Sequence, residues 1–425
     1  MANGHVHFIG AGGVGVAGVA HIAADFGYQV TGSDAVDSPM LESLRQRGLD
    51  VSPTHLESLP GQPDVVVFSS AIPDDNKELA EARRRGIPCL RRGEYLGRLA
   101  RHFDTVVAVS GSHGKTSTTA MLVHILKNAG KNPGYLVGGQ VNGWERSASA
   151  GDKKVFVTEV DESDGTQVCT HADFAIVINV EDDHCWGLGG VEKLEQCFED
   201  FAKNAHHVLA WQTETTKRLF DSLPDVSFFQ ETDIPQGLAL PFPGSHWRQN
   251  ATLAIAVATR LGVSLDLAIS ALRTFPGVNR RLTFHGKIGD GRGVVIEDYA
   301  HHPTELLATL DALREGYPDH ALLVVFQPHR YERVKRYGTQ FSEILGGVSR
   351  TWVVAPFAAW VSDGDGIDPS IIAERIPDGR GVYIQNEPVE IARSVKEYAA
   401  MVQGPYVIAV IGAGDICRVT DFLLE

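Results

Sequence analysis

The feature that most constrains this chain is a strand, a glycine loop and a helix that follow one another within residues 105–127. Residues 105–109 are apolar and typical of a short buried strand, and the apolar residues of 120–127 have helical spacing. Gly111 and Gly114 stand between them. Glycines let backbone N–H groups approach a phosphate, and the N-terminus of a helix adds partial positive charge. The arrangement therefore predicts a phosphate-binding loop.

We interpret this loop as an ATP site. Lys115 is expected to reach the β- and γ-phosphates, and the hydroxyl of Thr116 is expected to bind Mg²⁺. The usual pattern has four residues between its glycines and this loop has two, so the alternative is a glycine- and serine-rich turn before an ordinary helix. The flanking strand and helix favour the ATP site. Its expected residues are Gly111, Ser112, His113, Gly114, Lys115, Thr116 and Ser117.

A second glycine motif opens the chain. Residues 6–9 are typical of a strand, and Gly10-x-Gly12-x-x-Gly15 follows with the spacing of a dinucleotide-binding turn, before a helix expected from Val16. The next strand, residues 29–33, ends at Asp34, where such domains place the acid that binds a ribose hydroxyl. This motif offers a site for a diphosphate and a sugar, which suits a nucleotide sugar as well as NAD. The alternative is that the glycines only pack a tight turn.

Two acidic clusters follow predicted strands in the middle of the chain. Residues 155–158 are followed by four carboxylates within 159–164, and residues 174–180 are followed by three carboxylates and His184. Mg²⁺ prefers oxygen ligands next to phosphates, so the pattern predicts a cation site near the phosphate loop. The alternatives are an acidic loop without a ligand and a structural histidine.

The rest of the chain continues the alternation of strands and helices. His246 and Asn250 lie four residues apart before a helix expected at 251–261, and would share one helical face. Arg280 and Arg281 would stabilise a negative transition state between domains or form a basic, solvated turn. The last strands each end in a polar cluster, which packing alone does not require; they are predicted at residues 293–296, 321–326 and 406–411.

Length, composition and charge limit the class of protein. A chain of 425 residues, 43% of them hydrophobic, predicts a folded α/β protein of about two or three domains. The formal net charge of −15 argues against a general nucleic-acid surface. Five scattered cysteines without a C-x-x-C motif favour a reducing compartment. Since no signal segment and no membrane-spanning run is recognisable, we expect a cytoplasmic protein.

In their order along the chain, these motifs resemble those of the Mur ligases of peptidoglycan synthesis. Within that family they are most similar to the members that join L-alanine to UDP-N-acetylmuramate. The whole set is very specific because it extends over all three predicted domains. The matching segments are residues 7–15, 32–34, 69–72, 111–116, 159–164, 179–184, 298–305, 326–331 and 412–415.

The resemblance implies an α/β fold of three domains. Residues 1–101 would form a Rossmann-like domain that binds the UDP-sugar, and residues 102–276 a central P-loop ATPase domain with a mostly parallel sheet. Residues 277–425 would form a second Rossmann-like α/β domain that closes over the site with the amino acid. The implied cofactors are ATP and Mg²⁺, for which Mn²⁺ can substitute. The implied substrates are UDP-N-acetylmuramate and L-alanine, and we expect a monomer or a weak homodimer.

The resemblance also implies the site residues. Those assigned to the UDP-sugar are Gly10, Gly12, Gly13, Gly15, Asp34, His55, Ser69 and Ser70. ATP would contact His246, Asn250, Arg280, Arg281 and Asp298 in addition to the loop, and the metal would be bound by Thr116, Glu159 and His184. The amino acid would contact His329, Arg330 and Arg333. The expected catalytic residues are Lys115, Glu159, His184, Arg281 and His329, of which His329 is the candidate general base.

The implied chemistry is activation of a carboxylate by ATP to an acyl phosphate, which the amine then attacks. The chain departs from the family pattern at Trp247 and at residues 165–169 and 355–361. The alternative within the family is a paralogue that adds another amino acid or a peptide, as in murein recycling. An NAD-dependent oxidoreductase would leave Lys115 and Glu159 without a role. A non-catalytic nucleotide-binding protein would have no use for the metal ligands.

Overall fold

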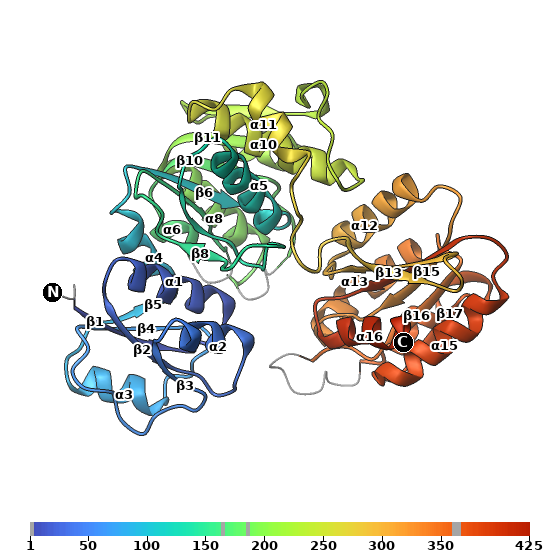
Figure 1. The fold of residues 1–425 in the computed structure, drawn as a ribbon, viewed down its shortest axis with the longest axis horizontal. Helices are drawn as coiled ribbons and strands as arrows, with labels where there is room; N and C mark the ends of the chain where they lie inside the picture. Colours follow the sequence, from blue (N-terminus) through green and yellow to red (C-terminus); the bar gives the residue numbers. More distant parts are fainter. Residues whose placement is uncertain (1–3, 163–165, 184–187, 359–366) are drawn as a thin grey trace. The chain divides into compact units, whose positions relative to one another are not determined.

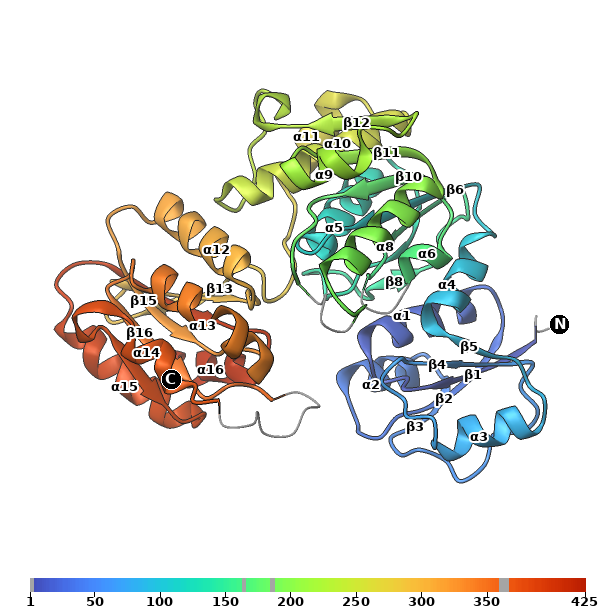
Figure 2. The same ribbon diagram turned by 180° about the vertical axis from the view of Figure 1, so that it is seen from behind.

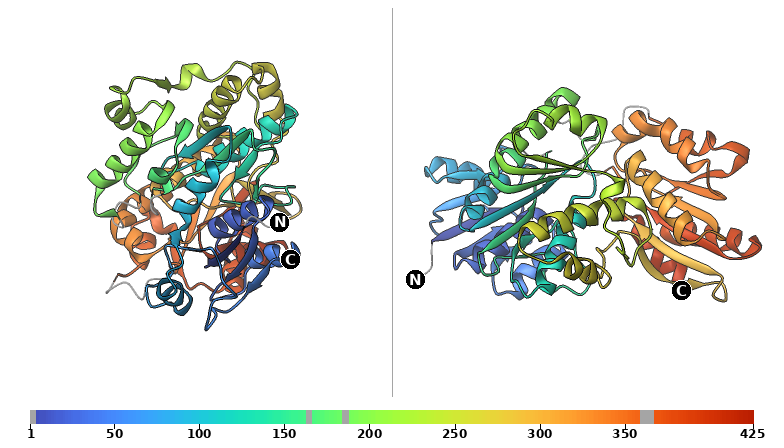
Figure 3. Two further views of the ribbon diagram at one scale, coloured as in Figure 1. Left: turned by 90° about the vertical axis from the view of Figure 1, so that its left-hand side faces the viewer. Right: turned by 90° about the horizontal axis from the view of Figure 1, so that it is seen from above.

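The computed structural model describes residues 4–162, 166–183, 188–358 and 367–425 (Figures 1 and 2). Its strands form three sheets of five, seven and six strands, in which almost every pair of neighbours is parallel (Figure 3). The predicted fold class, a three-domain α/β protein with mostly parallel sheets, is confirmed. In this part of the chain, no helix is both long and apolar enough to cross a membrane.

The first sheet is parallel throughout, with the order β3-β2-β1-β4-β5. Helix α1 begins at Val14, earlier than the predicted Val16, because the extended Gly13 serves as its N-cap. Ser38 and Asn76 cap α2 and α3 by accepting hydrogen bonds from backbone N–H groups. The elements are β1 (His5–Ile9), α1 (Val14–Asp25), β2 (Gln29–Ser33), α2 (Pro39–Gln46), β3 (Asp50–Ser52), β4 (Val65–Phe68), α3 (Lys77–Arg84), β5 (Cys89–Arg91) and α4 (Arg92–Ala100).

The second sheet has the order β12-β11-β10-β6-β9-β7-β8. Strand β10 ends at Val177 rather than at the predicted residue 180, because its partner β6 ends at Ser110, where the phosphate loop begins. The helix predicted at 251–261 begins earlier, at Ser245. The sequence did not indicate this start because the first turn is polar and has no apolar periodicity. The strands are β6 (Thr105–Ser110), β7 (Gly134–Leu136), β8 (Ala148–Ser149), β9 (Val155–Glu159), β10 (Ala172–Val177), β11 (Ala205–Trp211) and β12 (Val226–Phe229). The helices are α5 (Lys115–Asn128), α6 (Thr166–Cys169), α8 (Val191–Lys203), α9 (Glu214–Phe220), α10 (Ser245–Arg260) and α11 (Leu265–Leu272).

The third sheet has the order β13-β14-β18-β15-β16-β17. Its edge strand β13 is antiparallel to β14 and was not predicted, because its mixed, partly exposed residues form no apolar run. The strands are β13 (Thr283–Ile288), β14 (Gly293–Asp298), β15 (Ala321–Phe326), β16 (Arg350–Val354), β17 (Gly381–Ile384) and β18 (Tyr406–Ile411). The helices are α12 (Pro303–Gly316), α13 (Tyr331–Leu345), α14 (Ser370–Glu374), α15 (Pro388–Met401) and α16 (Val419–Leu424).

The first two sheets share one hydrophobic core. A single cluster of buried residues contains Val19 of α1, Leu99 of α4 and Phe156 of β9. Glycines on α4 permit the close packing: a Cβ on Gly93 would lie 2.8 Å from Cα of Thr166, and a Cβ on Gly97 would collide with the backbone carbonyl of Cys169. Helix α4 of the first sheet therefore packs directly against α6 of the second.

By their internal contacts, the residues divide into two compact units. Met1–Pro241 and Arg248–Pro276 form the first unit, which contains the first two sheets, and Phe242–Trp247 and Gly277–Glu425 form the second. The three predicted domain ranges, with boundaries after residues 101 and 276, stay a prediction. The shared core explains why the first two sheets count as one unit.

We expect Gly97→Ala to destabilise the first unit. The added methyl group meets backbone rather than a side chain that could turn away, so α4 or α6 must shift. Overpacking of this kind costs about 1–3 kcal/mol, which outweighs the helix preference for alanine. Denaturant unfolding measures the change in the free energy of unfolding.

Gly338→Ala in α13 is the matched control. A Cβ there would have Ile372 Cγ1 at 3.8 Å as its neighbour, which is ordinary contact. This variant should be as stable as the parent or more stable by about 1 kcal/mol. An equal effect of the two substitutions would contradict the close packing of α4.

Candidate active site

A cavity of about 320 Å³ lies in the first unit, where the glycine turn of the first sheet faces the phosphate loop of the second. It brings together residues predicted to bind a sugar nucleotide and residues predicted to bind ATP and a metal. The structure thus joins two motifs that are far apart in the sequence. The lining residues are Gly13, Val14, Gly15, Val16, Ser69, Arg92, Lys115, Thr116, Gly138, Glu159 and Asp161.

The glycine turn is held by the end of β2. Gly10, with φ of 82°, donates its N–H to the carbonyl oxygen of Ser33, and the N–H of Gly12 donates to Oδ2 of Asp34 at 2.7 Å. Helix α1 has neither a side-chain cap nor an acidic residue in its first turn. Its N-terminus therefore presents backbone N–H groups and partial positive charge at the cavity, as anion binding requires.

The phosphate loop is stabilised from within. Gly111 and Gly114 have φ of 145° and 85°, where a side chain would be strained. Lys115 donates from Nζ to the carbonyl oxygen of Gly111 at 2.7 Å and to Oε2 of Glu162 at 3.1 Å. Burial alone would lower the pKa of Lys115, but Glu162 and Asp161 outweigh it and raise the pKa above its ordinary value. The lysine is therefore a partly buried cation that lines the cavity.

Glu159 has the features of a metal ligand. Its Oε2 accepts a hydrogen bond from Thr116 Oγ1 at 2.9 Å, and its Oε1 is buried with no hydrogen-bond partner among the described residues. Burial raises the pKa of Glu159 to about 7. Gly138 provides the room for this carboxylate, since a Cβ there would overlap Oε1. A divalent cation fits this oxygen pair, because it would satisfy Oε1 and favour the ionised form.

The remaining metal-site prediction is only partly placed. Of Thr116, Glu159 and His184, the first two meet at the cavity, and His184 lies outside the described residues. Glu162 is buried next to Lys115, and burial raises its pKa to about 7 as well. Two carboxylates of raised pKa beside a phosphate loop are typical of functional sites.

Asn250 lies against the phosphate loop, and further contacts to the loop come from the segment that follows β10. A Cβ on Gly114 would lie 2.9 Å from Oδ1 of Asn250. The backbone N–H of His113 donates to Oδ1 of Asn179 at 2.8 Å, and Ser112 Oγ donates to the carbonyl oxygen of Glu181. His246 also lies on α10 but is assigned to the second unit.

In the second unit, Arg280 is anchored to its own sheet. Its guanidinium donates to Oε1 of Glu297 at 2.6 Å and to the carbonyl oxygens of Gly412 and Gly414 at 2.7 and 2.9 Å. Arg281 stacks on Tyr299, with 5.0 Å between the guanidinium carbon and the ring centroid. The backbone of Arg280 has φ of 62°, which is a left-handed conformation. The guanidinium of Arg280 also lies over Tyr299, at 4.9 Å from the ring centroid, so the two arginines share this aromatic ring.

Asp298 is fully engaged by its surroundings. Its carboxylate accepts from the N–H groups of Leu282 and Ala300 at 2.8 Å each, and from Thr309 Oγ1 at 3.1 Å. Burial raises its pKa. These contacts tie the end of β14 to α12 and to the segment that enters the third sheet.

The predicted amino-acid residues lie together after β15. Nη1 of Arg333 is 3.3 Å from Nδ1 of His329, and the ring of His329 stacks on Phe357 with centroids 5.7 Å apart. Arg330, with φ of 66°, donates its N–H to the carbonyl oxygen of Phe357 at 2.8 Å. Arg333 is buried and His329 is partly accessible.

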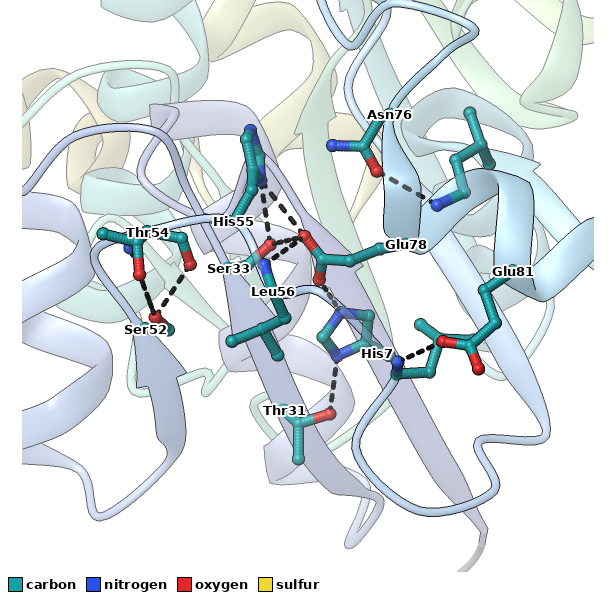
Figure 4. A network of polar contacts seen from close by, with 12 residues as sticks. His7, Thr31, Ser33, Ser52, Thr54, His55, Leu56, Asn76, Glu78 and Glu81 are labelled. Atoms are coloured by element: carbon teal, nitrogen blue, oxygen red, sulfur yellow. Dashed lines mark hydrogen bonds and ion pairs between the residues drawn. The ribbon is translucent and has the colours of Figure 1, made fainter.

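His55 does not line the cavity. It lies on the segment after β3, in a hydrogen-bond network around the buried Glu78 (Figure 4). Burial alone would raise the pKa of Glu78, but hydrogen bonds from His7, Ser33 and Leu56 hold it below its ordinary value. Of the predicted serines, Ser69 lines the cavity and Ser70 is exposed.

Among the cavity residues that the sequence analysis did not identify are Arg92 and Gly138. The guanidinium of Arg92 packs on Gly15, where a Cβ would lie 3.1 Å from Nη1, and its Nη2 donates to Thr166 Oγ1 at 3.0 Å. Its position directly after β5, at the carboxyl end of a parallel strand, is the signal that could have identified it. Gly138 offered no such signal, because its role depends on the rotamer of Glu159.

Comparison with known proteins identifies the family. The chain is 36% identical to the UDP-N-acetylmuramate–L-alanine ligase of Mycolicibacterium gilvum, over 99% of this chain and 95% of the relative. It is 33% identical to the corresponding enzyme of Thermobifida fusca, over 99% and 96%. The chain belongs to the Mur ligase family. Family models match at residues 5–104 (Mur ligase family, catalytic domain), 109–210 (Mur ligase middle domain) and 280–414 (Mur ligase, glutamate ligase domain).

Solved Mur ligases have the same fold. The crystal structure of a UDP-N-acetylmuramate–alanine ligase from Thermotoga maritima is 26% identical and superposes with a TM-score of 0.82, covering 100% of this chain and 99% of the other. A murein peptide ligase from Psychrobacter arcticus, 22% identical, superposes with a TM-score of 0.68 over 99% and 98%. This Mur ligase is therefore an ATP-dependent amide ligase that adds an amino acid or a peptide to a UDP-muramyl acceptor.

We expect Gly138→Ala to disable the cation site without unfolding the chain. The new methyl group displaces the Glu159 carboxylate and breaks its contact with Thr116. Phosphate release should then need at least about tenfold more Mg²⁺ for half-maximal rate, as for loss of a charge-assisted contact. Gln140→Ala, at an exposed residue of the same loop, is the control and should leave the Mg²⁺ requirement unchanged.

Glu78 should contribute stability that depends on pH. Its folded pKa is below the ordinary value of 4.5, so its stabilising effect is present above that pH and is lost as the pH falls through the folded pKa. The difference in free energy of unfolding between the parent and Glu78→Gln should therefore be largest near neutral pH and shrink in acid. Glu57→Gln, at an exposed residue, provides the comparison. A difference that is constant with pH would show that the carboxylate charge is not involved.

Proposed function

We propose that this Mur ligase joins L-alanine to the lactyl carboxylate of UDP-N-acetylmuramate, with conversion of ATP to ADP and phosphate. The cavity shared by the glycine turn and the phosphate loop carries the proposal, because it offers a diphosphate site and an ATP site within one unit. The identity of 32–36% to several L-alanine ligases, over nearly the full chain, supports the amino acid.

The reaction needs two steps. An oxygen of the lactyl carboxylate attacks the γ-phosphorus of ATP, the bond to the β,γ-bridging oxygen breaks, and an acyl phosphate and ADP form. The amine of L-alanine then attacks the acyl carbon, loses a proton, and expels phosphate. Both steps concentrate negative charge on oxygens, so catalysis depends on positioning and on cations at fixed places.

Lys115 and Arg92 provide such cations at the cavity. Lys115 turns from Glu162 to the β- and γ-phosphates, while the backbone N–H groups of the loop hold the phosphate oxygens. The guanidinium of Arg92 packs against Gly15 and lines the cavity between the glycine turn and the phosphate loop. An acceptor bound at the glycine turn would extend past it to reach the phosphate loop. A guanidinium binds a carboxylate or phosphate through two parallel hydrogen bonds, which orients it.

The residues present suit a divalent cation. Thr116 and Glu159 would hold it, and His184 is the proposed third ligand. When bound, Mg²⁺ neutralises charge on the phosphate oxygens and polarises them for transfer. Glu159 is kept in place for this purpose by Gly138 and by its hydrogen bond from Thr116.

The remaining assignments follow the family pattern. Asn250, beside Gly114, contributes to the nucleotide site together with His246, Arg281 and Asp298. His329 is the proposed general base, and its neighbour Arg333 would bind the carboxylate of the amino acid. Gly10, Gly12, Gly13, Gly15, Asp34, His55, Ser69 and Ser70 are the proposed UDP-sugar residues.

The second candidate is a paralogue that adds a peptide. This alternative is supported by the murein peptide ligase from Neisseria meningitides, which is 26% identical over 66% of this chain, with a TM-score of 0.58. The residues after β15, where the ring of His329 stacks on Phe357, would then contact the first residue of the peptide.

Phosphate release from Mg·ATP tests the proposal. With UDP-N-acetylmuramate present, L-alanine is compared with glycine, L-serine and the free tripeptide L-alanyl-γ-D-glutamyl-meso-diaminopimelate, and Lys115→Ala serves as the blank. We expect release that needs both the sugar nucleotide and L-alanine and that falls at least about a thousandfold in the variant, as for loss of a main charge stabiliser. Release with the tripeptide alone would reject L-alanine and establish the paralogue.

A further inference from the structure

Glu78, on α3, is the centre of a buried network in the first sheet (Figure 4). Its Oε1 accepts from Ser33 Oγ at 2.7 Å and from the N–H of Leu56 at 3.0 Å, and lies 3.2 Å from Nδ1 of His55. Its Oε2 lies 2.7 Å from Nε2 of His7. One carboxylate thus connects β1, β2 and the segment after β3.

The network determines which ring nitrogens carry protons. The ionised carboxylate of Glu78 only accepts, so His7 donates from Nε2 and its Nδ1, 2.8 Å from Thr31 Oγ1, accepts. Ser33 uses its hydroxyl proton on Glu78, so its oxygen, 3.1 Å from Nδ1 of His55, is an acceptor for that ring. Both neighbours of Nδ1 in His55 are therefore acceptors. The proton of the neutral ring lies on Nδ1, and Nε2 has a free lone pair.

His55 is the accessible end of this network. Its side chain is 28% exposed, whereas those of Glu78 and His7 are fully buried. In the sheet, β3 lies beside β2 and β2 beside β1; the glycine turn follows β1, and Asp34 follows β2. A nucleotide whose diphosphate lies on the glycine turn and whose ribose lies at Asp34 extends its nucleoside toward the segment that bears His55.

We propose that Glu78 is a positioning residue that holds His55 with its proton on Nδ1, so that Nε2 accepts a hydrogen bond from the nucleoside of the bound sugar nucleotide. The donor is the imide N–H of uracil or a ribose hydroxyl. The proposal rests on the proposed function, because it takes a UDP-sugar as the ligand of the first sheet.

A purely structural network is the alternative, and Glu81 provides its control. Glu81 lies three residues further along α3 and accepts from the N–H of Leu59 at 2.6 Å, so it also fixes the segment after β3. It has no contact with His55 among the described residues. Glu81→Ala therefore measures the effect of loosening this segment without changing the histidine.

The first experiment is ¹⁵N NMR of the histidine rings in the parent protein at pH 8. The spectrum of a His55→Gln variant identifies the signals of His55. We expect a protonated Nδ1 and an unprotonated Nε2. A ring protonated on Nε2, or on both nitrogens, would overturn the proposal whether or not any variant folds.

The second experiment is titration calorimetry with UDP. Glu78→Ala should weaken binding about five- to tenfold, the size of one hydrogen bond, and Glu78→Gln, which keeps a neutral acceptor, should weaken it less. Glu81→Ala should bind UDP as the parent does. In the ligase assay, Glu78→Ala should raise KM for UDP-N-acetylmuramate while KM for ATP and kcat stay unchanged.

Nucleotide analogues identify the donor. Titrations are repeated with 3-methyl-UDP, 2′-deoxy-UDP and 3′-deoxy-UDP, each of which lacks one candidate donor. The analogue that lacks the true donor should bind the parent and Glu78→Ala equally. Equal weakening of UDP and of all three analogues by Glu78→Ala would overturn the proposal. If the parent neither binds UDP nor releases phosphate, the proposed function fails; UDP binding that is indifferent to Glu78 rejects only this inference.

Discussion

The close packing of α4 against α6 determines how far apart the glycine turn and the phosphate loop lie. Gly93 and Gly97 remove the two side chains that would separate these helices, and the shared core then joins both sheets into one unit. A ligase that couples ATP to a carboxylate needs the reacting atoms within contact distance and in line. Here that distance is set by backbone against backbone, which is the least deformable contact a core can contain.

Charged side chains are concentrated at the cavity. Glu162 is buried and Lys115 and Glu159 are partly buried, and the two carboxylates have pKa values raised to about 7 by the loss of water. Opposite charges at this density hold one another in place before any ligand arrives. The site is therefore preorganised for a substrate that carries both phosphates and a cation.

Much of this arrangement follows from the sequence, because parallel sheets place the ends of buried strands at one edge. Glu159 could be expected at the cavity because it follows an apolar run, and the two glycine motifs could be expected there from their spacing. Arg92 and Gly138 could not, since their roles depend on which neighbour a side chain meets across two sheets. The antiparallel β13 was missed because a half-exposed edge strand needs no apolar run.

The internal partners of Lys115 have a consequence for turnover. Its ammonium donates hydrogen bonds to the Gly111 carbonyl oxygen and to Glu162. If Lys115 binds phosphate as proposed, it exchanges one set of hydrogen bonds for another instead of creating new ones, so the net gain in affinity is small. When ADP remains after transfer, Glu162 can take back the ammonium and replace the departing phosphate. On the proposed role of Lys115, the same contact would shorten the residence time of the spent nucleotide.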